Sequence, residues 1–170
     1  MTDFPGALVR VRPALADDCS YLAGLIRRLA AFEDPQAVPA ADEASLRRDG
    51  FGPHPRFTAL VAERDGLAAG GVILLEGYSS WAAAPTLIVH DLFIEPEQRG
   101  AGIGRHLLAA AARVAVERGC CRVDVNVVGW NQPARDFYHS LGFAALADWL
   151  PYRLNRAGVE ALAAGIGARG

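Results

Sequence analysis

Apolar residues recur along the chain at two different spacings, and each spacing predicts a different element. Alternation of apolar and polar positions, or a short unbroken apolar run, is typical of a β-strand. About seven segments have this pattern, namely 7–12, 57–63, 68–75, 87–94, 122–128, 143–146 and 149–154. Arg64-Asp65-Gly66 is a turn sequence between the second and third of these strands, and it predicts a hairpin.

Other segments have apolar residues three or four positions apart, which predicts amphipathic helices. About four such helices are expected, over 17–33, 41–48, 103–119 and 131–142. Asp34-Pro35 suits a helix end, and Gly119 and Gly142 suit C-terminal caps. Residues 77–81 are expected to form an exposed connector, and the tail after residue 155 to be partly helical or frayed.

These elements predict one folded domain of the α+β, or mixed α/β, class. Strands lie on both sides of two long helices, with a hairpin early in the chain and a strand–loop–helix–strand unit late. A length of 170 residues is typical of a single domain, and 52% hydrophobic residues are enough for a substantial core. No repeat or linker divides the chain, so the expected domain is 1–170, with a core of about 7–155 and a tail of 156–170.

Composition and charge exclude several classes of function. The formal net charge is −2 and no basic run occurs, which argues against a general nucleic-acid binder. No apolar run approaches the roughly 18 residues of a membrane span, and the first residues contain no apolar stretch typical of a signal peptide, so none is expected. The three cysteines form no disulfide pattern and the four histidines are scattered, so no metal site is expected. We expect a cytoplasmic protein with reduced thiols.

The best candidate for chemistry is the glycine-rich turn Arg99-Gly100-Ala101-Gly102-Ile103-Gly104, between the strand at 87–94 and the helix that follows. Backbone without Cβ atoms can approach a ligand closely, and the first amides of a helix attract phosphate. A P-loop would need lysine after the last glycine, and a dinucleotide fingerprint would need glycine there, but the residue is Arg105. A different pyrophosphate loop and a turn without a ligand both fit these residues.

The segment from Val89 to Phe143 resembles the core of the GCN5-related N-acetyltransferases (GNAT). Three features carry the resemblance, in the family's order. The first is the strand before the turn, and the second is the turn itself, whose Arg99, Gly102 and Gly104 fit the pattern Q/R-x-x-G-x-G/A. The third is a later group of residues, comprising Trp130-Asn131, Phe137-Tyr138 and Leu141-Gly142-Phe143.

Within that superfamily the chain is similar to the branch of diamine (spermidine/spermine) and thialysine N-acetyltransferases. This similarity covers roughly residues 9–154. It rests on motifs along the chain, namely Arg12-Pro13-Ala14, Asp18-Cys19, Leu25-Ile26, Leu29-Ala30, Phe32-Glu33, Asp49-Gly50-Phe51-Gly52, His54-Pro55, 128–134 and 149–154. The resemblance implies a mostly antiparallel, splayed central sheet of about seven strands flanked by about four helices. It also implies a homodimer.

The resemblance further implies an enzyme that moves acetyl from acetyl-CoA to a primary amine by direct attack. The acceptor would be a small molecule, either a diamine or polyamine or an amino-acid-like amine. The implied coenzyme A contacts are Leu92, Phe93, Ile94, Arg99, Gly100, Ala101, Gly102, Ile103, Gly104, Arg105, Asn131, Pro133, Ala134 and Tyr138. Asn131 also suits the N-cap of the helix that it precedes.

Two residues are the catalytic candidates. Tyr138 matches the family's general acid, because a phenol of pKa about 10 can protonate a departing thiolate, although its helical apolar stripe also suits a core residue. His90 stands where the branch has the glutamate of a Glu-Asp pair, and histidine exchanges protons near neutral pH. His90, Asp91 or a chain of water molecules would serve as the base.

The implied acceptor-binding residues are Phe32, Glu33, Trp81, His90, Asp91, Asp124, Asn126 and Trp149. Because His90 replaces a glutamate and Ser79 an aspartate of the branch, the acidic wall is thinner, which favours an amine smaller than spermine. Two alternative functions remain open: a protein lysine or N-terminal acetyltransferase, and a non-catalytic acyl-CoA-binding module.

Overall fold

The computed structural model describes residues 8–167, which form two compact units joined between Gln132 and Pro133. Within the described part of the first unit, five strands form one sheet in the order β1-β2-β3-β4-β5. They are β1 (Val9–Pro13), β2 (Thr58–Arg64), β3 (Leu67–Ser79), β4 (Ala84–Ile94) and β5 (Val123–Val125). The pairing is antiparallel from β1 to β4, and β5 runs parallel to β4.

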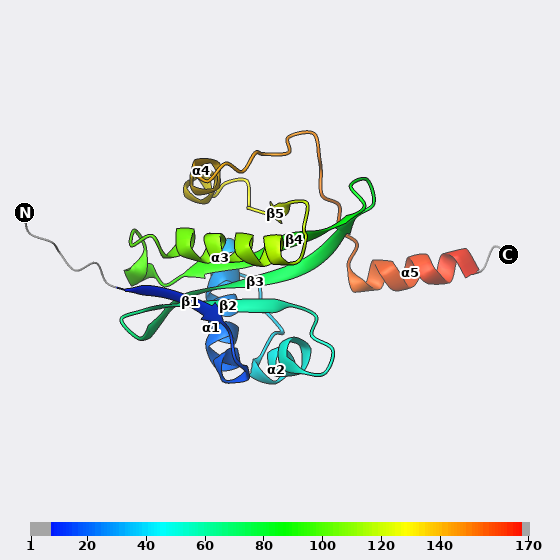
Figure 1. The fold of residues 1–170 in the computed structure, drawn as a ribbon. Coiled ribbons are helices and arrows are strands. Elements are labelled where there is room, and N and C mark those ends of the chain that lie inside the picture. Colours follow the sequence, from blue (N-terminus) through cyan, green and yellow to red (C-terminus); the bar gives the residue numbers. More distant parts are fainter. Residues whose placement is uncertain (1–7, 168–170) are drawn as a thin grey trace, which may run out of the picture. The chain divides into compact units, whose positions relative to one another are not determined.

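Helices cover both faces of this sheet. In chain order the helical elements are η1 (Ala16–Asp18), α1 (Cys19–Glu33), α2 (Glu43–Phe51), η2 (Pro96–Gln98), α3 (Ile103–Glu117), α4 (Gln132–Ser140) and α5 (Arg156–Gly167). Figure 1 shows α1 and α2 on one face of the sheet and α3 on the other. Between residues 8 and 167, none of the helices combines the length and the apolar character that a bilayer crossing requires.

A β-bulge in β4 decides which side chains reach each face of the sheet. Asp91 pairs with Ile73 of β3, and Val89 pairs with the next residue, Leu74, so His90 is the extra residue of the bulge. Neighbouring residues of a strand point to opposite faces of the sheet, so the side chains of Ile73 and Leu74 lie on opposite faces. Each cross-strand partner points to the same face as the residue it pairs with. Asp91 therefore faces α1, whereas Val89 faces α3; in a regular strand these two residues would share a face.

Two layers of buried side chains hold the helices on the sheet. Beneath α1, Leu22 and Leu25 pack with Val61 and Phe93. On the opposite face α3 contacts β1 to β4 and buries Ile103, Leu107, Leu108, Ala110, Ala111 and Ala115. Burial of one leucine contributes about 1.5–3 kcal/mol, so this layer fixes α3 and, with it, the turn that precedes the helix.

Arg12 of β1 fixes the start of α1. Its guanidinium donates from Nη1 to Oδ2 of Asp18 and from Nε to Oε1 of Glu63, each at 2.7 Å. The Arg12 guanidinium lowers the pKa of Asp18, because it stabilises the charged carboxylate. This network joins β1, β2 and the residue before α1, and α1 in turn carries side chains of the site described below.

The predicted α+β class is confirmed, as are the helices over 17–33, 41–48, 103–119 and 131–142 and the first four strands. The hairpin turn after β2 has positive φ angles of 53° at Asp65 and 80° at Gly66, as its sequence predicted. The tail is helical in α5. Ala7, the predicted start of the first strand, and residues 168–170 lie outside the described residues.

The structure corrects the predictions for four segments of the chain. The connector at 77–81 continues β3 as far as Ser79, which pairs with Ala84 of β4. The strand predicted over 122–128 is confined to β5, because its ladder with β4 ends at Val89, immediately before the bulge. Residues 143–146 and 149–154 form no strand, since alternation alone does not supply a pairing partner. The sheet of the described residues therefore has five strands instead of about seven.

Candidate functional site

The glycine turn presents backbone amides that have no partner in their own helix. Gly100 and Gly102 have φ angles of +79° and +77°, a left-handed conformation that suits glycine. The first hydrogen bond of α3 runs from the His106 amide to the Gly102 carbonyl at 3.1 Å, and no side chain caps the helix. The amides of residues 103–105 therefore have no partner within α3, and they form the positive end of the helix dipole.

Space over this turn is open. A Cβ atom built on Gly100 would meet no atom within 4 Å, and one on Gly102 would meet only the His106 ring, at 3.9 Å. Arg105, in the first turn of α3, is exposed. Free amides, an open approach and an exposed cation together form a seat that fits a diphosphate.

One edge of β4 has no strand partner beyond the bulge. β5 pairs with β4 only at Leu87, Ile88 and Val89, whereas residues 91–94 pair with β3 on their other side. In the part of the chain that the structure describes, no strand pairs with residues 90–94 on the β5 side. The backbone of Leu92 and Ile94 can therefore accept an extended ligand as an added strand.

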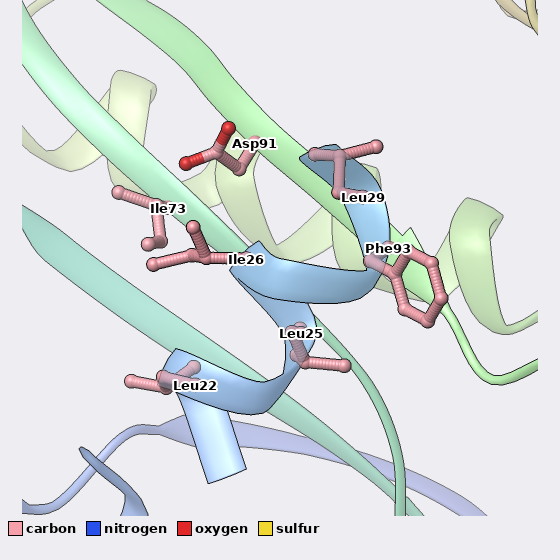
Figure 2. Close-up of a pocket in the computed structure, with 8 residues that line it drawn as sticks. Leu22, Leu25, Ile26, Leu29, Ile73, Asp91 and Phe93 are labelled. Atoms are coloured by element: carbon pink, nitrogen blue, oxygen red, sulfur yellow. The ribbon is translucent and has the colours of Figure 1, made fainter. Parts of the chain in front are cut away.

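Three titratable side chains lie close together at the end of α1 and in β4. Asp91 lies against an apolar pocket lined from α1 by residues that include Ile26 and Leu29 (Figure 2). Burial raises the pKa of the Asp91 carboxyl, and the neighbouring His90 partly offsets this effect. Burial also raises the pKa of Glu33, and the Asp91 carboxylate raises it further. Two carboxylates that are costly to ionise side by side favour a cation between them.

An aromatic pair lies beside this group. The ring of Phe32, which precedes Glu33 in α1, packs on the ring of Trp130 with centroids 5.3 Å apart and planes tilted by 58°. Trp130 was not among the predicted acceptor residues, although it directly precedes Asn131 in the motif. The contact of its ring with α1, far away in sequence, could not be inferred from the motif.

The other predicted acceptor residues of the first unit are Trp81, Asp124 and Asn126. Trp81 occupies the turn of the β3–β4 hairpin, before the first residue of β4, and is 90% exposed. The Asp124 carboxylate accepts hydrogen bonds from Nε of Arg122 at 2.9 and 3.1 Å. Asn126 is exposed just after β5. Among the predicted acceptor residues, Glu33, His90 and Asp91 are close enough to influence one another's charge.

In the second unit, Tyr138 lies in α4 within an aromatic group. Its ring centroid is 5.5 Å from those of Phe137 and Phe143. The Tyr138 carbonyl accepts hydrogen bonds from the amides of Leu141 and Phe143 at 3.0 and 3.1 Å, which fixes the end of the helix. Pro133 and Ala134 occupy the first turn of α4, which Asn131 precedes. Trp149 lies in the segment between α4 and α5.

No metal centre is evident among residues 8–167, because no three histidine, cysteine, aspartate or glutamate side chains form a group that could hold an ion.

The chain matches the acetyltransferase (GNAT) family over residues 25–143. It belongs to the GNAT acetyltransferases. As a GNAT enzyme, it uses acetyl-CoA as its acetyl donor, and the open amides at the start of α3 fit the diphosphate of that donor.

Relatives of this GNAT enzyme include small-amine acetyltransferases. It is 33% identical to the thialysine N-epsilon-acetyltransferase of Mus musculus over 168 residues, covering 92% of this chain and 98% of that protein. It is 32% identical to the spermidine/spermine N(1)-acetyltransferase-like protein 1 of Homo sapiens, covering 86% of this chain and 22% of that protein. An aminoglycoside N-acetyltransferase in complex with CoA has the same fold, with a TM-score of 0.73 at 20% identity over 91% of this chain and 99% of that chain.

The Gly102→Ala variant tests the seat for the diphosphate. A side chain at φ +77° costs about 1–2 kcal/mol, and the turn must change conformation to relieve this strain. We expect the KM for acetyl-CoA to rise about 5- to 30-fold, with a smaller effect on kcat. Steady-state kinetics with varied acetyl-CoA measure both.

Gly119→Ala is the matched control. Gly119 has φ +67° and open space around it, and it lies past the other end of α3. It carries a similar strain, so its thermal stability should fall as in Gly102→Ala while its KM for acetyl-CoA stays at the wild-type value. Equal changes of KM in the two variants would contradict a specific role of the turn.

Proposed function

We propose that this GNAT enzyme acetylates a primary amine of a small molecule, and that its two compact units work as one catalytic domain. The grouping of Glu33, His90 and Asp91 next to the open edge of β4 carries this proposal. The relative from Mus musculus, named for an amino-acid-like amine, supports it. The family match over residues 25–143 spans both units, which supports a shared function for them.

The donor binds through backbone more than through side chains. The amides of residues 100–105 hold the diphosphate, with Arg105 adding charge, and the edge of β4 at Leu92 and Ile94 pairs with the pantetheine arm. Asn131, Pro133 and Ala134, at the start of α4, are further residues that we assign to cofactor binding. Arg99 holds the start of the turn in place, because its Nε already donates to the Ile94 carbonyl at 3.3 Å.

The acceptor binds through charge. Its ammonium group lies between Glu33 and Asp91, where it lowers the cost of ionising two neighbouring carboxyls. His90 supplies a base at the same place, and Phe32 and Trp130 form an apolar wall for the carbon chain. Because residue 90 is not a carboxylate, a second ammonium group of a long polyamine has no partner there. A short diamine or an amino-acid-like amine therefore fits best.

The transfer follows from these roles. His90 takes a proton from the ammonium, and the free amine attacks the thioester carbonyl carbon. The N–C bond forms, the C–S bond breaks, and the second amine proton leaves to solvent. Tyr138 gives its phenolic proton to the coenzyme A thiolate and regains one from water, so that free thiol and amide leave the enzyme.

A panel of acceptor amines tests the function. We expect release of coenzyme A thiol with short diamines or with lysine-like amino acids, at a higher kcat/KM than with spermine or with lysine-containing peptides. A thiol-detecting assay with acetyl-CoA measures all acceptors under one condition. Turnover of peptides alone would contradict the proposal, and so would tight CoA binding without turnover of any amine.

Tyr138→Phe tests the general acid. Removal of the hydroxyl should lower kcat about 100- to 10,000-fold, because the thiolate then leaves without a proton. The Kd for coenzyme A should stay close to the wild-type value. Tyr152→Phe, which changes a tyrosine outside α4, is the matched control and should keep wild-type turnover. A wild-type rate in Tyr138→Phe would remove Tyr138 from the mechanism.

Asp91→Asn tests the acceptor site through its pH dependence. Because burial raises the pKa of Asp91, its negative charge is present above this raised pKa and is lost as the pH falls through it. The KM for a cationic acceptor should therefore rise toward acidic pH, at a higher pH than an ordinary aspartate would give. In Asp91→Asn this KM should be about 10- to 150-fold higher already at neutral pH.

The control for this variant is Asp65→Asn, in the turn between β2 and β3, where asparagine tolerates the positive φ of 53°. It should keep the wild-type KM for the acceptor across the pH range. A wild-type KM in Asp91→Asn would contradict a role of Asp91 in binding the ammonium.

His90→Gln should lower kcat at neutral pH, and the loss of the acidic limb from its kcat profile would identify the base.

A further inference from the structure

The segment that leads from β4 into the glycine turn is anchored to two other elements. Glu95 accepts a hydrogen bond from Nη2 of Arg28, on α1, at 2.7 Å. Gln98 accepts one from Nη1 of Arg64, at the end of β2, at 3.0 Å. The Glu95 amide also donates to the Ala69 carbonyl of β3 at 3.0 Å. Residues 95–98 are thus held from α1, β2 and β3 just before the turn begins.

An aromatic ring connects the same anchor to the turn itself. The buried ring of Phe93 has the Arg28 guanidinium carbon 5.5 Å from its centroid and that of Arg99 at 5.7 Å. Cations at this distance are attracted to the ring by its quadrupole. Arg99 is the first residue of the turn, so Phe93 holds one end of the turn against a side chain of α1.

Glu95 makes this arrangement electrostatically possible. Two guanidinium groups on one ring repel each other, and the Glu95 carboxylate neutralises Arg28. Burial and the nearby Glu95 carboxylate raise the pKa of the Tyr21 hydroxyl, also on α1, and its oxygen is buried without a hydrogen-bond partner among the described residues. A carboxylate released from Arg28 would therefore have the Tyr21 hydroxyl as an alternative donor.

We infer that Arg28 and Glu95 are positioning residues for the coenzyme A site, acting through Phe93 and Arg99 on the turn that holds the diphosphate. The inference rests on the proposed function only in its assignment of that turn. In this role the ion pair acts by fixing where the amides of the turn lie, without a contact of its own to the cofactor. Its loss should therefore weaken donor binding and leave the chemical step unchanged.

The test compares Arg28→Gln and Glu95→Gln with Arg27→Gln, the exposed neighbouring arginine of α1. We expect each of the first two variants to raise the KM for acetyl-CoA and the calorimetric Kd for coenzyme A about 3- to 20-fold. The kcat and the KM for the acceptor should stay within about twofold. The double variant should resemble the single variants, because the two residues act as one unit.

Two further measurements make the test specific. With acetyl-pantetheine, a donor that lacks the diphosphate, Arg28→Gln and wild type should have equal kinetic constants. The exchanged pair Arg28→Glu with Glu95→Arg should recover part of the lost affinity, which also keeps the test valid where a single variant folds poorly. An unchanged Kd for coenzyme A in both single variants, or an equal loss with acetyl-pantetheine, would overturn the inference.

Failure of this inference and failure of the proposed function give different results. Wild-type protein that binds no coenzyme A would refute the assignment of the turn and the inference with it. Wild type and variants that bind coenzyme A equally would refute the positioning role alone. Variants that bind coenzyme A less tightly support the inference whatever acceptor the enzyme uses.

Discussion

The bulge at His90 is the constraint on which the rest of the site depends. A regular strand would put Asp91 on the same face as Val89, under α3 and away from α1. The extra residue turns the remainder of β4 over, so that Asp91 and Phe93 meet α1. It also coincides with the end of the ladder between β4 and β5, which leaves the edge of residues 90–94 without a strand partner in the described sheet. One irregularity thus shapes both the proposed donor edge and the proposed acceptor group.

The two parts of the site favour ligands of opposite charge. At the start of α3, the amides of residues 103–105 have no acceptor within the helix, and the helix dipole is positive there. At the end of α1 and in β4, the carboxyls of Glu33 and Asp91 have raised pKa values, because partial desolvation disfavours their charged forms. An anionic donor suits the first part and a cationic acceptor the second. A fold selected for stability alone would satisfy these groups internally, so their retention is typical of a binding site.

The features that the sequence predicted well are local ones. The glycine turn, the helix after it and the hairpin at Asp65-Gly66 depend on residues next to one another, and they were found at the expected positions. The two strands predicted after Gly142 were wrong because a strand needs a partner, which alternation does not reveal. The contacts of Trp130 with Phe32 and of Arg28 with Glu95 join residues far apart in the chain, so no local pattern predicted them.

Residue 90 has an unusual freedom within β4. Because the ladder with β3 passes directly from Val89 to Asp91, no cross-strand partner depends on the residue between them. Its side chain is exposed, so a change there removes little buried surface. The fold therefore places little constraint on the residue at this position. With the acceptor role that we propose for His90, a change in the chemical character of residue 90 alters the range of amines that the enzyme accepts, while the register of the sheet stays the same.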